Sequence, residues 1–367
     1  MKSTGISFLH LSAIMLLSIG LMNHVILIPS LLEISKRDAW LTIIVTTVLF
    51  IPVFWAIAII AKRSQAMNKP MMTWLVERIG KIPAGIIAAA FVCLLLLSAV
   101  TTGKDMKIWT SSTYLPLTPP SVIVLSFIGL CLYLSLQGIR SIALVSVILL
   151  PFVLVFGEFV MIANFPHKDY SMLFPLFEYG SSGMWRGIVY VGTGFVEILY
   201  ILLLIHYVKN KVKTGYIILL GLAMAGLTIG PVMGAIAEFG PVEAATQRFP
   251  AFEEWRLVRI GNYINHLDFL SIYQWISGAF IRISLAIFLI SDLFPARRRT
   301  VAASIAAVLI AVLTIWPMSD ISFLRAMMIY YFPYVFACML ILAAVLLVLA
   351  LIAYRKKGWS QHGSESR

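Results

Sequence analysis

Charged residues are scarce in this sequence, and the motifs of familiar enzymes are missing from it. Asp, Glu, Lys and Arg make up 12% of the 367 residues, hydrophobic residues make up 61%, and the mean hydropathy is +0.96. A soluble domain needs more polar surface than this composition supplies. No HExxH, GxSxG or GxGxxG motif occurs, and the six histidines are scattered. The sequence therefore predicts neither a soluble protein nor an enzyme, and no cofactor.

Cysteine is also rare, with three residues at Cys93, Cys131 and Cys338. They lie in apolar segments far apart in the sequence, without CxxC or Cys/His spacing, so we expect no disulfide and no metal site. The net charge of +12 is of the size that nucleic-acid-binding proteins carry. However, the basic residues lie between apolar segments, where they set the orientation of a membrane protein. We therefore expect the lipid bilayer as a partner, and no nucleic acid.

Long apolar segments are what the sequence does contain. A helix of roughly 20 residues crosses the hydrocarbon core of a bilayer and satisfies its backbone hydrogen bonds internally. The segments are continuous rather than alternating, which argues against the strands of a transmembrane barrel. We expect an all-α integral membrane protein with about ten transmembrane helices, near residues 8–32, 39–61, 84–112, 119–137, 141–164, 185–208, 214–237, 267–293, 299–317 and 325–354.

The expected organisation is a single transmembrane domain over residues 1–358, followed by a short polar cytoplasmic tail at 359–367. Basic residues gather in alternate connections, such as 62–81, 209–213 and 297–299, whereas the other connections carry most of the carboxylates. Loops rich in Lys and Arg stay in the cytoplasm. This bias places both termini there.

Two further stretches are unlike membrane spans. Residues 63–83 combine Lys and Arg with Met, Trp and Leu, which predicts an amphipathic helix at the membrane interface. Residues 239–266 form the longest external connection and contain two prolines, aromatic residues and mixed charge. Long connections in compact proteins are usually functional or disordered, and this composition favours an ordered external cap.

Two spans contain helix-interrupting residues at matching positions, in residues 18–30 (SIGLMNHVILIPS) and 190–197 (YVGTGFVE). Interrupted helices five apart are typical of inverted repeats with a midplane site, here about 8–164 and 185–317, before the last helix at about 325–354. Freed N–H groups attract a carboxylate, and freed carbonyl groups receive an ammonium group or a cation. Such a pair of helix ends suits a zwitterionic amino acid. The alternative is that the glycines only let helices pack closely.

The candidate ligand-binding residues lie at these interruptions and on the third and eighth spans. They are Ser18, Gly20, Leu21, Asn23, Thr101, Gly192, Thr193, Gly194, Phe195, Tyr273 and Ser277. His24 lies beside them, but a lone histidine in a helix is more often structural than a ligand.

Three ionisable residues within the spans, Glu197, Glu158 and Arg282, are candidates for a proton or charge relay, because a charge in hydrocarbon is costly unless it is paired or hydrated. Glu197 and Arg282 either form an ion pair, or Glu197 faces a polar cavity alone and titrates. Glu158 lies nearer the outer end of the fifth span, where a solvated structural role is as well supported as proton coupling.

The chain resembles the spore germination proteins that form the B subunit of nutrient germinant receptors, within the amino acid–polyamine–organocation transporter superfamily. The residues that carry the resemblance are IGLMNHVILIPS (19–30), DYSMLFPLFEYGSSGMWRG (169–187), GTGFVE (192–197) and FPAFEEWRLVRIGNYINHLDFLSIYQW (249–275). The family often has Arg before Leu-Asp in the last stretch, whereas this chain has His266. A specific role for a basic group at that position is therefore in doubt.

The resemblance implies a LeuT-like fold of 5+5 inverted repeats with helices 1 and 6 broken. It also implies a sensor in the inner membrane of the spore that recognises a small nutrient, most often an amino acid, and works with an A subunit and a lipoprotein C subunit. Two alternatives share this fold: a proton-coupled amino acid transporter, driven through Glu197 or Glu158, and an ion or water conduit. The sequence does not identify the germinant.

Overall fold

The computed structural model describes residues 5–66, 69–260 and 266–362, with side chains described up to residue 352. Within these residues the chain is helical, apart from turns, loops and one isolated bridge that pairs Ile6 with Val208. Nine helical segments of this part are long and apolar enough to cross a membrane, and α6 (Pro120–Leu136) is a shorter apolar helix. The all-α membrane architecture predicted from composition is confirmed.

Ten apolar spans follow one another along the described part of the chain. Seven spans are single helices: span 2 is α3 (Ala39–Ala66), span 3 is α5 (Lys81–Thr113), span 4 is α6, span 5 is α7 (Ile139–Ala163), span 7 is α10 (Thr214–Phe239), span 8 is α13 (Leu270–Asp292) and span 9 is α14 (Arg299–Ile315). Two interrupted spans are span 1, with α1 (Phe8–Leu21), η1 (Met22–Ile26) and α2 (Ile28–Ser35), and span 6, with α8 (Ser182–Val196), η5 (Glu197–Tyr200), α9 (Ile201–Leu204) and η6 (Ile205–Tyr207). Span 10 is also interrupted and contains α15 (Asp320–Ala326), η9 (Met327–Tyr331) and α16 (Phe332–His362).

Short helices connect the spans. They are η2 (Lys36–Asp38), α4 (Met71–Ile79), η3 (Phe165–His167), η4 (Tyr170–Leu173), α11 (Pro241–Ala244), α12 (Pro250–Leu257), η7 (Leu267–Phe269) and η8 (Ala296–Arg298). α4 lies in the stretch predicted to be amphipathic, and it buries Trp74 and Leu75 against α5 while Lys69 pairs with Glu77 at 2.7 Å on its polar side. α11 and α12 give order to the expected external cap, of which residues 261–265 lie outside the described part.

The interruption in span 1 is a π-helical turn. At η1 the chain leaves the α-helical hydrogen-bond pattern, and α2 then continues with Pro29 in its first turn. Proline fits there because its missing N–H has no partner at a helix start. The span ends at Lys36, whose φ of +46° turns the chain into α3.

The interruption in span 6 is a 3₁₀ turn at η5, and it lies later than the sequence predicts. Gly192 and Gly194 remain inside α8, and the irregular segment begins at Glu197. Both interrupted segments keep right-handed helical dihedral angles at their caps. The interruption in span 1 is therefore a widened turn and that in span 6 a tightened turn. The interruption expected at residues 190–197 is corrected to a 3₁₀ turn that begins at Glu197.

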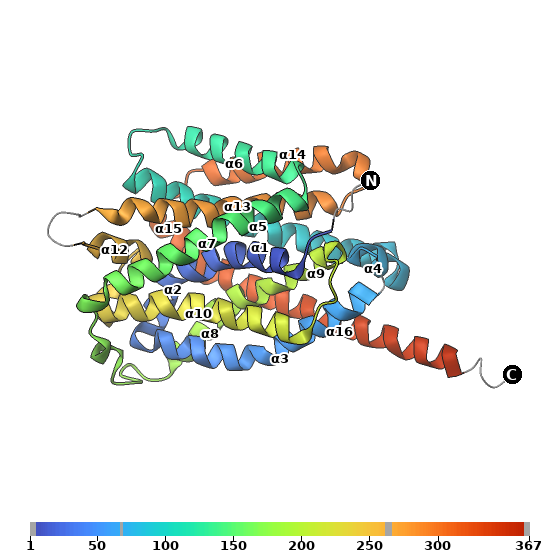
Figure 1. The fold of residues 1–367 in the computed structure, drawn as a ribbon, viewed down its shortest axis with the longest axis horizontal. Helices are drawn as coiled ribbons and strands as arrows, with labels where there is room; N and C mark the ends of the chain where they lie inside the picture. Colours follow the sequence, from blue (N-terminus) through green and yellow to red (C-terminus); the bar gives the residue numbers. More distant parts are fainter. Residues whose placement is uncertain (1–4, 67–68, 261–265, 363–367) are drawn as a thin grey trace.

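Spans 1, 6 and 8 form the centre of the bundle. The most apolar window of span 6 is 89% buried and that of span 8 is 83% buried, against 11% for α7. α1 lies between α13 and α10 and also packs on α7, whereas α8 packs on α3 and α16 (Figure 1). Neighbouring helices surround spans 1, 6 and 8 on most sides and hold their side chains in fixed positions. These three spans can therefore form a binding site.

The two ends of the bundle differ. The start of α1 and the end of α16 lie at one end, together with α4 and α9, and α12 lies at the opposite end (Figure 1). The first and last spans of the described chain thus begin and end on the same side of the bundle, as an even number of spans requires. α16 extends to His362, so the described part of the expected polar tail, residues 359–362, continues the helix, and residues 363–367 lie outside the described part.

Candidate ligand site at the interrupted helices

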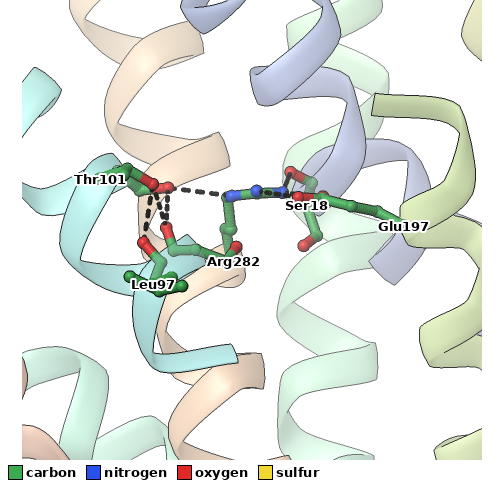
Figure 2. Close-up of polar contacts among 7 residues, drawn as sticks. Ser18, Leu97, Thr101, Glu197 and Arg282 are labelled. Carbon is green, nitrogen blue, oxygen red and sulfur yellow. Dashed lines mark hydrogen bonds and ion pairs between the residues drawn. The ribbon is translucent and has the colours of Figure 1, made fainter. Parts of the chain in front are cut away.

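Arg282 and Glu197 form a two-pronged ion pair in the centre of the bundle. Arg282 Nη1 donates to Glu197 Oε2 at 2.6 Å, and Nη2 donates to Oε1 at 2.6 Å (Figure 2). Both residues are buried, with exposed fractions of 3% and 0%. Of the two alternatives for Glu197, the structure shows the pair. The planar guanidinium matches a carboxylate in this way, which a lysine ammonium does not.

The same guanidinium contacts two further helices. Arg282 Nε donates to Thr102 Oγ1 at 2.9 Å, and Nη1 also donates to the carbonyl oxygen of Ser18 at 2.9 Å. One side chain of α13 therefore joins α1, α5 and η5. A buried charge is tolerated when it is paired and its remaining donors are hydrogen-bonded, and these contacts meet that condition. Ser18 takes part through its main-chain carbonyl, the kind of group predicted to receive a cation.

Asn23 in η1 faces Gly194 in α8. The Asn23 side chain is fully buried, and neither its amide oxygen nor its amide nitrogen has a hydrogen-bond partner. A Cβ atom at position 194 would lie 1.8 Å from Asn23 Oδ1, so only glycine fits there. Buried polar groups are nearly always hydrogen-bonded, so the unpartnered amide of Asn23 is a candidate hydrogen-bonding group of the site. The two interrupted spans meet at this contact.

A cavity of about 170 Å³ is bounded by α1, η1, α7, α10, α12 and α13, and neither Arg282 nor Glu197 lines it. Gly20 and Leu21, two of the predicted ligand residues, form part of its wall, as does Glu158. His24 lines the cavity too, and its Nδ1 forms a 2.9 Å hydrogen bond with the carbonyl oxygen of Leu227. That contact favours the structural reading of His24.

The remaining predicted residues lie around this centre without lining the cavity. Thr101 Oγ1 donates to the carbonyl oxygens of Leu97 and Ser98 within α5 (Figure 2). On α8, Thr193 Oγ1 donates to the carbonyl oxygen of Phe332 at 3.0 Å. Packing occupies the rest: Gly192 lies against Phe336 and Phe50, Phe195 against Phe50 and Phe54, Tyr273 against Phe152 and Phe156, and Ser277 is buried on α13.

Sequence reasoning missed three polar groups near the ion pair. Thr102 holds Arg282, although the neighbouring Thr101 had been singled out. Tyr200 and Tyr331 are also buried, and both interact electrostatically with Glu197 and Arg282. Tyr331 lies at the π-helical turn η9 of span 10, and Pro333, two residues after that turn, is the sequence signal that could have located it.

Aromatic side chains close the end of the bundle at which α12 lies. Trp109 of α5 stacks on Trp275 of α13 with ring centroids 4.3 Å apart, and Phe252 of α12 meets Trp109 edge-on. Beside them, Arg248 forms 2.8 Å contacts with Asp105 and Asp320. Lys104, which precedes Asp105 in α5, donates to the carbonyl oxygen of Trp316. The structure is thus closed over the candidate site.

In the part of the chain that the structure describes, no cluster of three His, Cys, Asp or Glu side chains has the arrangement of a metal site. The free cysteines also lie apart, with Cys131 buried and the other two exposed. The groups that meet at the centre, Arg282, Glu197, Thr102 and the Ser18 carbonyl, supply charges and hydrogen bonds.

Comparisons with known proteins agree on one family. The family model described as "Spore germination protein" matches residues 6–323. Spore germination protein XB of Bacillus anthracis is 39% identical over 356 residues, covering 96% of this chain and 99% of the relative. YfkT of Bacillus subtilis (strain 168) is 25% identical over 298 residues, covering 79% of this chain and 78% of the relative.

The fold is shared with a solved structure. MhsT, solved in complex with L-phenylalanine, matches with a TM-score of 0.66 at 13% identity, covering 94% of this chain and 97% of that chain. At this identity the likeness concerns the fold alone, and it confirms the LeuT-like arrangement. The family matches also confirm that the chain is a multi-pass membrane protein outside the enzyme classes. The chain belongs to the spore germination protein family.

Proposed function

We propose that this chain is the membrane-embedded B subunit of a nutrient germinant receptor. It binds a small germinant, an amino acid, and passes the signal to an A subunit and a lipoprotein C subunit in the inner membrane of the spore. The similarity to Spore germination protein XB over nearly the whole chain supports this role. The basic connections, which favour the cytoplasmic side, support an orientation with both termini in the spore core.

The observation that carries the proposal is the contact of Arg282 with Glu197, Ser18 and Thr102. These groups offer both halves of an amino acid a partner. The carboxylate of the ligand competes with Glu197 for the guanidinium, and its ammonium group competes with Arg282 for the Ser18 carbonyl oxygen and for Glu197. The unpartnered amide of Asn23 adds a further hydrogen-bonding group at the same junction.

Signalling follows from this competition. In the structure, Arg282 joins four helices in one arrangement. A ligand that binds these groups better in a second arrangement shifts the population toward it, because only differential affinity moves such an equilibrium. We propose that the second arrangement separates η5 from α13 and opens the aromatic closure formed by Trp109 and Trp275. The partner subunits would respond to that change.

A germination assay tests the proposal. Spores that carry this chain as their only B subunit are exposed to amino acids, sugars and nucleosides, and we expect a response to one or a few amino acids. Glu197→Gln should abolish the response while the protein stays in the membrane. Glu253→Gln is the matched control, because Glu253 pairs with Arg256 on the exposed face of α12. A full response of the Glu197→Gln spores would contradict the proposed site.

A proton-coupled amino acid transporter is the second candidate, and the position of Glu158 on the cavity wall favours it among the alternatives. The fold shared with MhsT, which was solved with an amino acid, is compatible with either role. Uptake of labelled amino acid into proteoliposomes separates them, since a sensor binds the amino acid without accumulating it. A conduit for ions or water would instead give conductance or swelling in the same vesicles.

A further inference from the structure

A buried charge cluster lies at the end of the cavity near α12. Lys168 Nζ lies 3.2 Å from Glu238 Oε1 and 4.0 Å from Glu254 Oε2, and the side chains of all three are at most 5% exposed. Asn164 Nδ2 donates to the carbonyl oxygen of Glu254 at 2.6 Å. The cluster joins the connection after α7, the end of α10 and α12. None of these residues belongs to the centre around Arg282.

The cluster has one cation for two carboxylates. Glu238 Oε1 and Glu254 Oε1 both lack a hydrogen bond, but Glu238 Oε1 lies 3.2 Å from Lys168 Nζ, so Glu254 Oε1 is the oxygen left without a charged partner. Glu254 is 4% exposed, its Oε1 has no hydrogen-bond partner, and the residue lines the cavity together with Lys168. The carboxylate of Glu254 packs directly against Gly234. A Cβ atom at position 234 would lie 2.6 Å from Glu254 Oε2, so a larger residue there would force the carboxylate to move. A buried carboxylate with a free oxygen favours a cationic hydrogen-bond donor.

Most of the other residues that line the cavity are apolar. Gly226 of α10, which is itself exposed, lies at its edge, and a Cβ atom there would meet no other atom within 4 Å. The volume of about 170 Å³ is close to that of an engineered cavity of about 150 Å³ that holds benzene. It therefore fits an apolar body of about six non-hydrogen atoms.

α12 covers the cavity and is fastened to α13, which is in turn hydrogen-bonded to α7. Trp255 Nε1 donates to Gln274 Oε1 of α13 at 2.8 Å, and Gln274 Nε2 donates to the carbonyl oxygen of Val153 of α7 at 3.0 Å. All three residues line the cavity. Any molecule that enters from this end displaces or passes α12, the element that carries Glu254.

We infer that this cavity binds a small solute that carries a primary ammonium group on a compact apolar body. The ammonium group donates to Glu254 Oε1, and the apolar body packs along α10 at Gly226. The site is distinct from the junction of Arg282 and Glu197. The inference rests on the proposed function only where the solute is taken to be the germinant itself, because ammonium binding can be measured without germination.

The charges that face Glu254 set the pH dependence of binding. Burial raises the pKa of the Glu254 carboxyl well above its usual range, the charge of Glu238 raises it further, and Lys168 lowers it. Glu158 and His24 are the other ionisable groups on the cavity wall. When an ammonium group binds, the carboxylic proton of Glu254 passes to solvent and the cation takes its place. Binding therefore weakens as the pH falls, by up to about tenfold per pH unit for one linked proton.

The test uses the full-length chain in lipid nanodiscs, with butylammonium and butanoate as probes of opposite charge whose alkyl chains differ by one methylene. Titration calorimetry should show saturable binding of butylammonium, release of a proton, and no binding of butanoate. Glu254→Gln should weaken butylammonium binding at least tenfold. Gly226→Leu, which adds a side chain at the cavity edge and keeps Glu254, should weaken it to a similar extent if the apolar body packs there. Gly215→Leu in the same helix is the control, because position 215 is also open and lies outside the cavity wall.

Unchanged affinity in the Glu254→Gln or Gly226→Leu variant would overturn the inference, as would equal binding of butanoate. At a pH high enough for Glu254 to be ionised, Lys168→Gln gives a test of opposite sign, because it removes the resident cation and should tighten butylammonium binding. These results are independent of the germination assay with Glu197→Gln. If amine binding fails while that variant still loses its response, the second site is wrong and the proposed function stands.

Discussion

Asn23 and Gly194 lie in direct contact where the two interrupted spans meet, and this contact leaves no room for a side chain at position 194. The ideal Cβ position lies 1.8 Å from Asn23 Oδ1 and 3.2 Å from Leu27 Cδ2. Two helices far apart in the sequence thus approach each other closely beside an amide that has no other partner. Small residues allow such an approach in membrane proteins. The glycines of α8 therefore serve close packing as well as the site.

Gly194→Ala should disturb this junction. The added methyl group forces Asn23 to move, and overpacking of this kind costs about 1–3 kcal/mol. We expect a lower melting temperature in detergent and loss of the germination response. Gly129→Ala in α6 is the control, because a Cβ atom there meets no other atom within 4 Å. Combining Asn23→Ala with Gly194→Ala should recover the melting temperature but not the response; recovery of both would show that Asn23 does not bind the ligand.

Single and double replacements of the central ion pair should separate its structural role from its binding role. Glu197→Leu or Arg282→Met alone leaves a buried charge without its partner, which costs about 3–5 kcal/mol. The double variant removes both charges, and we expect it to regain most of the melting temperature while the spores stay unresponsive. Thermal unfolding and germination are measured on the same four proteins. Additive losses in the double variant would argue against the pair.

The fastening of α12 gives a prediction about local opening. Trp255→Phe keeps the ring packed but removes the donor to Gln274. One hydrogen bond contributes about 1 kcal/mol, so amide exchange in residues 250–257 should become about fivefold faster. Mass spectrometry of deuterium exchange measures this, and Trp185→Phe, at an exposed tryptophan of α8, is the control. Equal protection in both variants would mean that α12 is held by other contacts.

The stability of the α12 end should depend on pH through Glu254. The pKa of this carboxyl is raised in the folded protein by burial and by Glu238. Because the folded protein holds this proton more tightly than the unfolded chain, protonation stabilises the fold. This stabilisation is complete below the pKa of the unfolded chain, about 4.3, and is lost as the pH rises through the pKa of the folded protein. We therefore expect the melting temperature to fall with rising pH, and to fall less in Glu254→Gln. Glu253→Gln should retain the wild-type slope, and a wild-type slope in Glu254→Gln would exclude this carboxyl as the cause.

Much of the fold follows from the sequence because apolar length alone determines which segments cross a bilayer. The first interruption was placed correctly, since Gly20 and Pro29 flank η1. The second was placed too early, because Gly192 is packed by Phe336 and Phe50 and remains in α8. Glycines in a membrane span indicate either close packing of helices or an interrupted helix, and the sequence alone does not distinguish the two.

The site was predictable only in part, because a charge stands out in the sequence only when it lies within an apolar segment. Glu197 and Arg282 stand out as charges within apolar segments, so their pairing was a definite alternative before the structure. Lys168, Glu238 and Glu254 lie in or beside connections, where charges are expected. Only the folded arrangement shows that they are buried together at one cavity.

Equilibrium binding of a radiolabelled amino acid to the purified chain tests the central claim most directly. The amino acid is one that triggers germination, and the comparison is between Arg282→Lys and Arg256→Lys. Lysine keeps the charge at position 282 but loses the two-pronged contact, whereas Arg256 pairs with Glu253 on an exposed face. We predict saturable binding to the wild type and to Arg256→Lys, and at least tenfold weaker binding to Arg282→Lys. Equal affinity in all three proteins would contradict a ligand site at the Arg282–Glu197 junction.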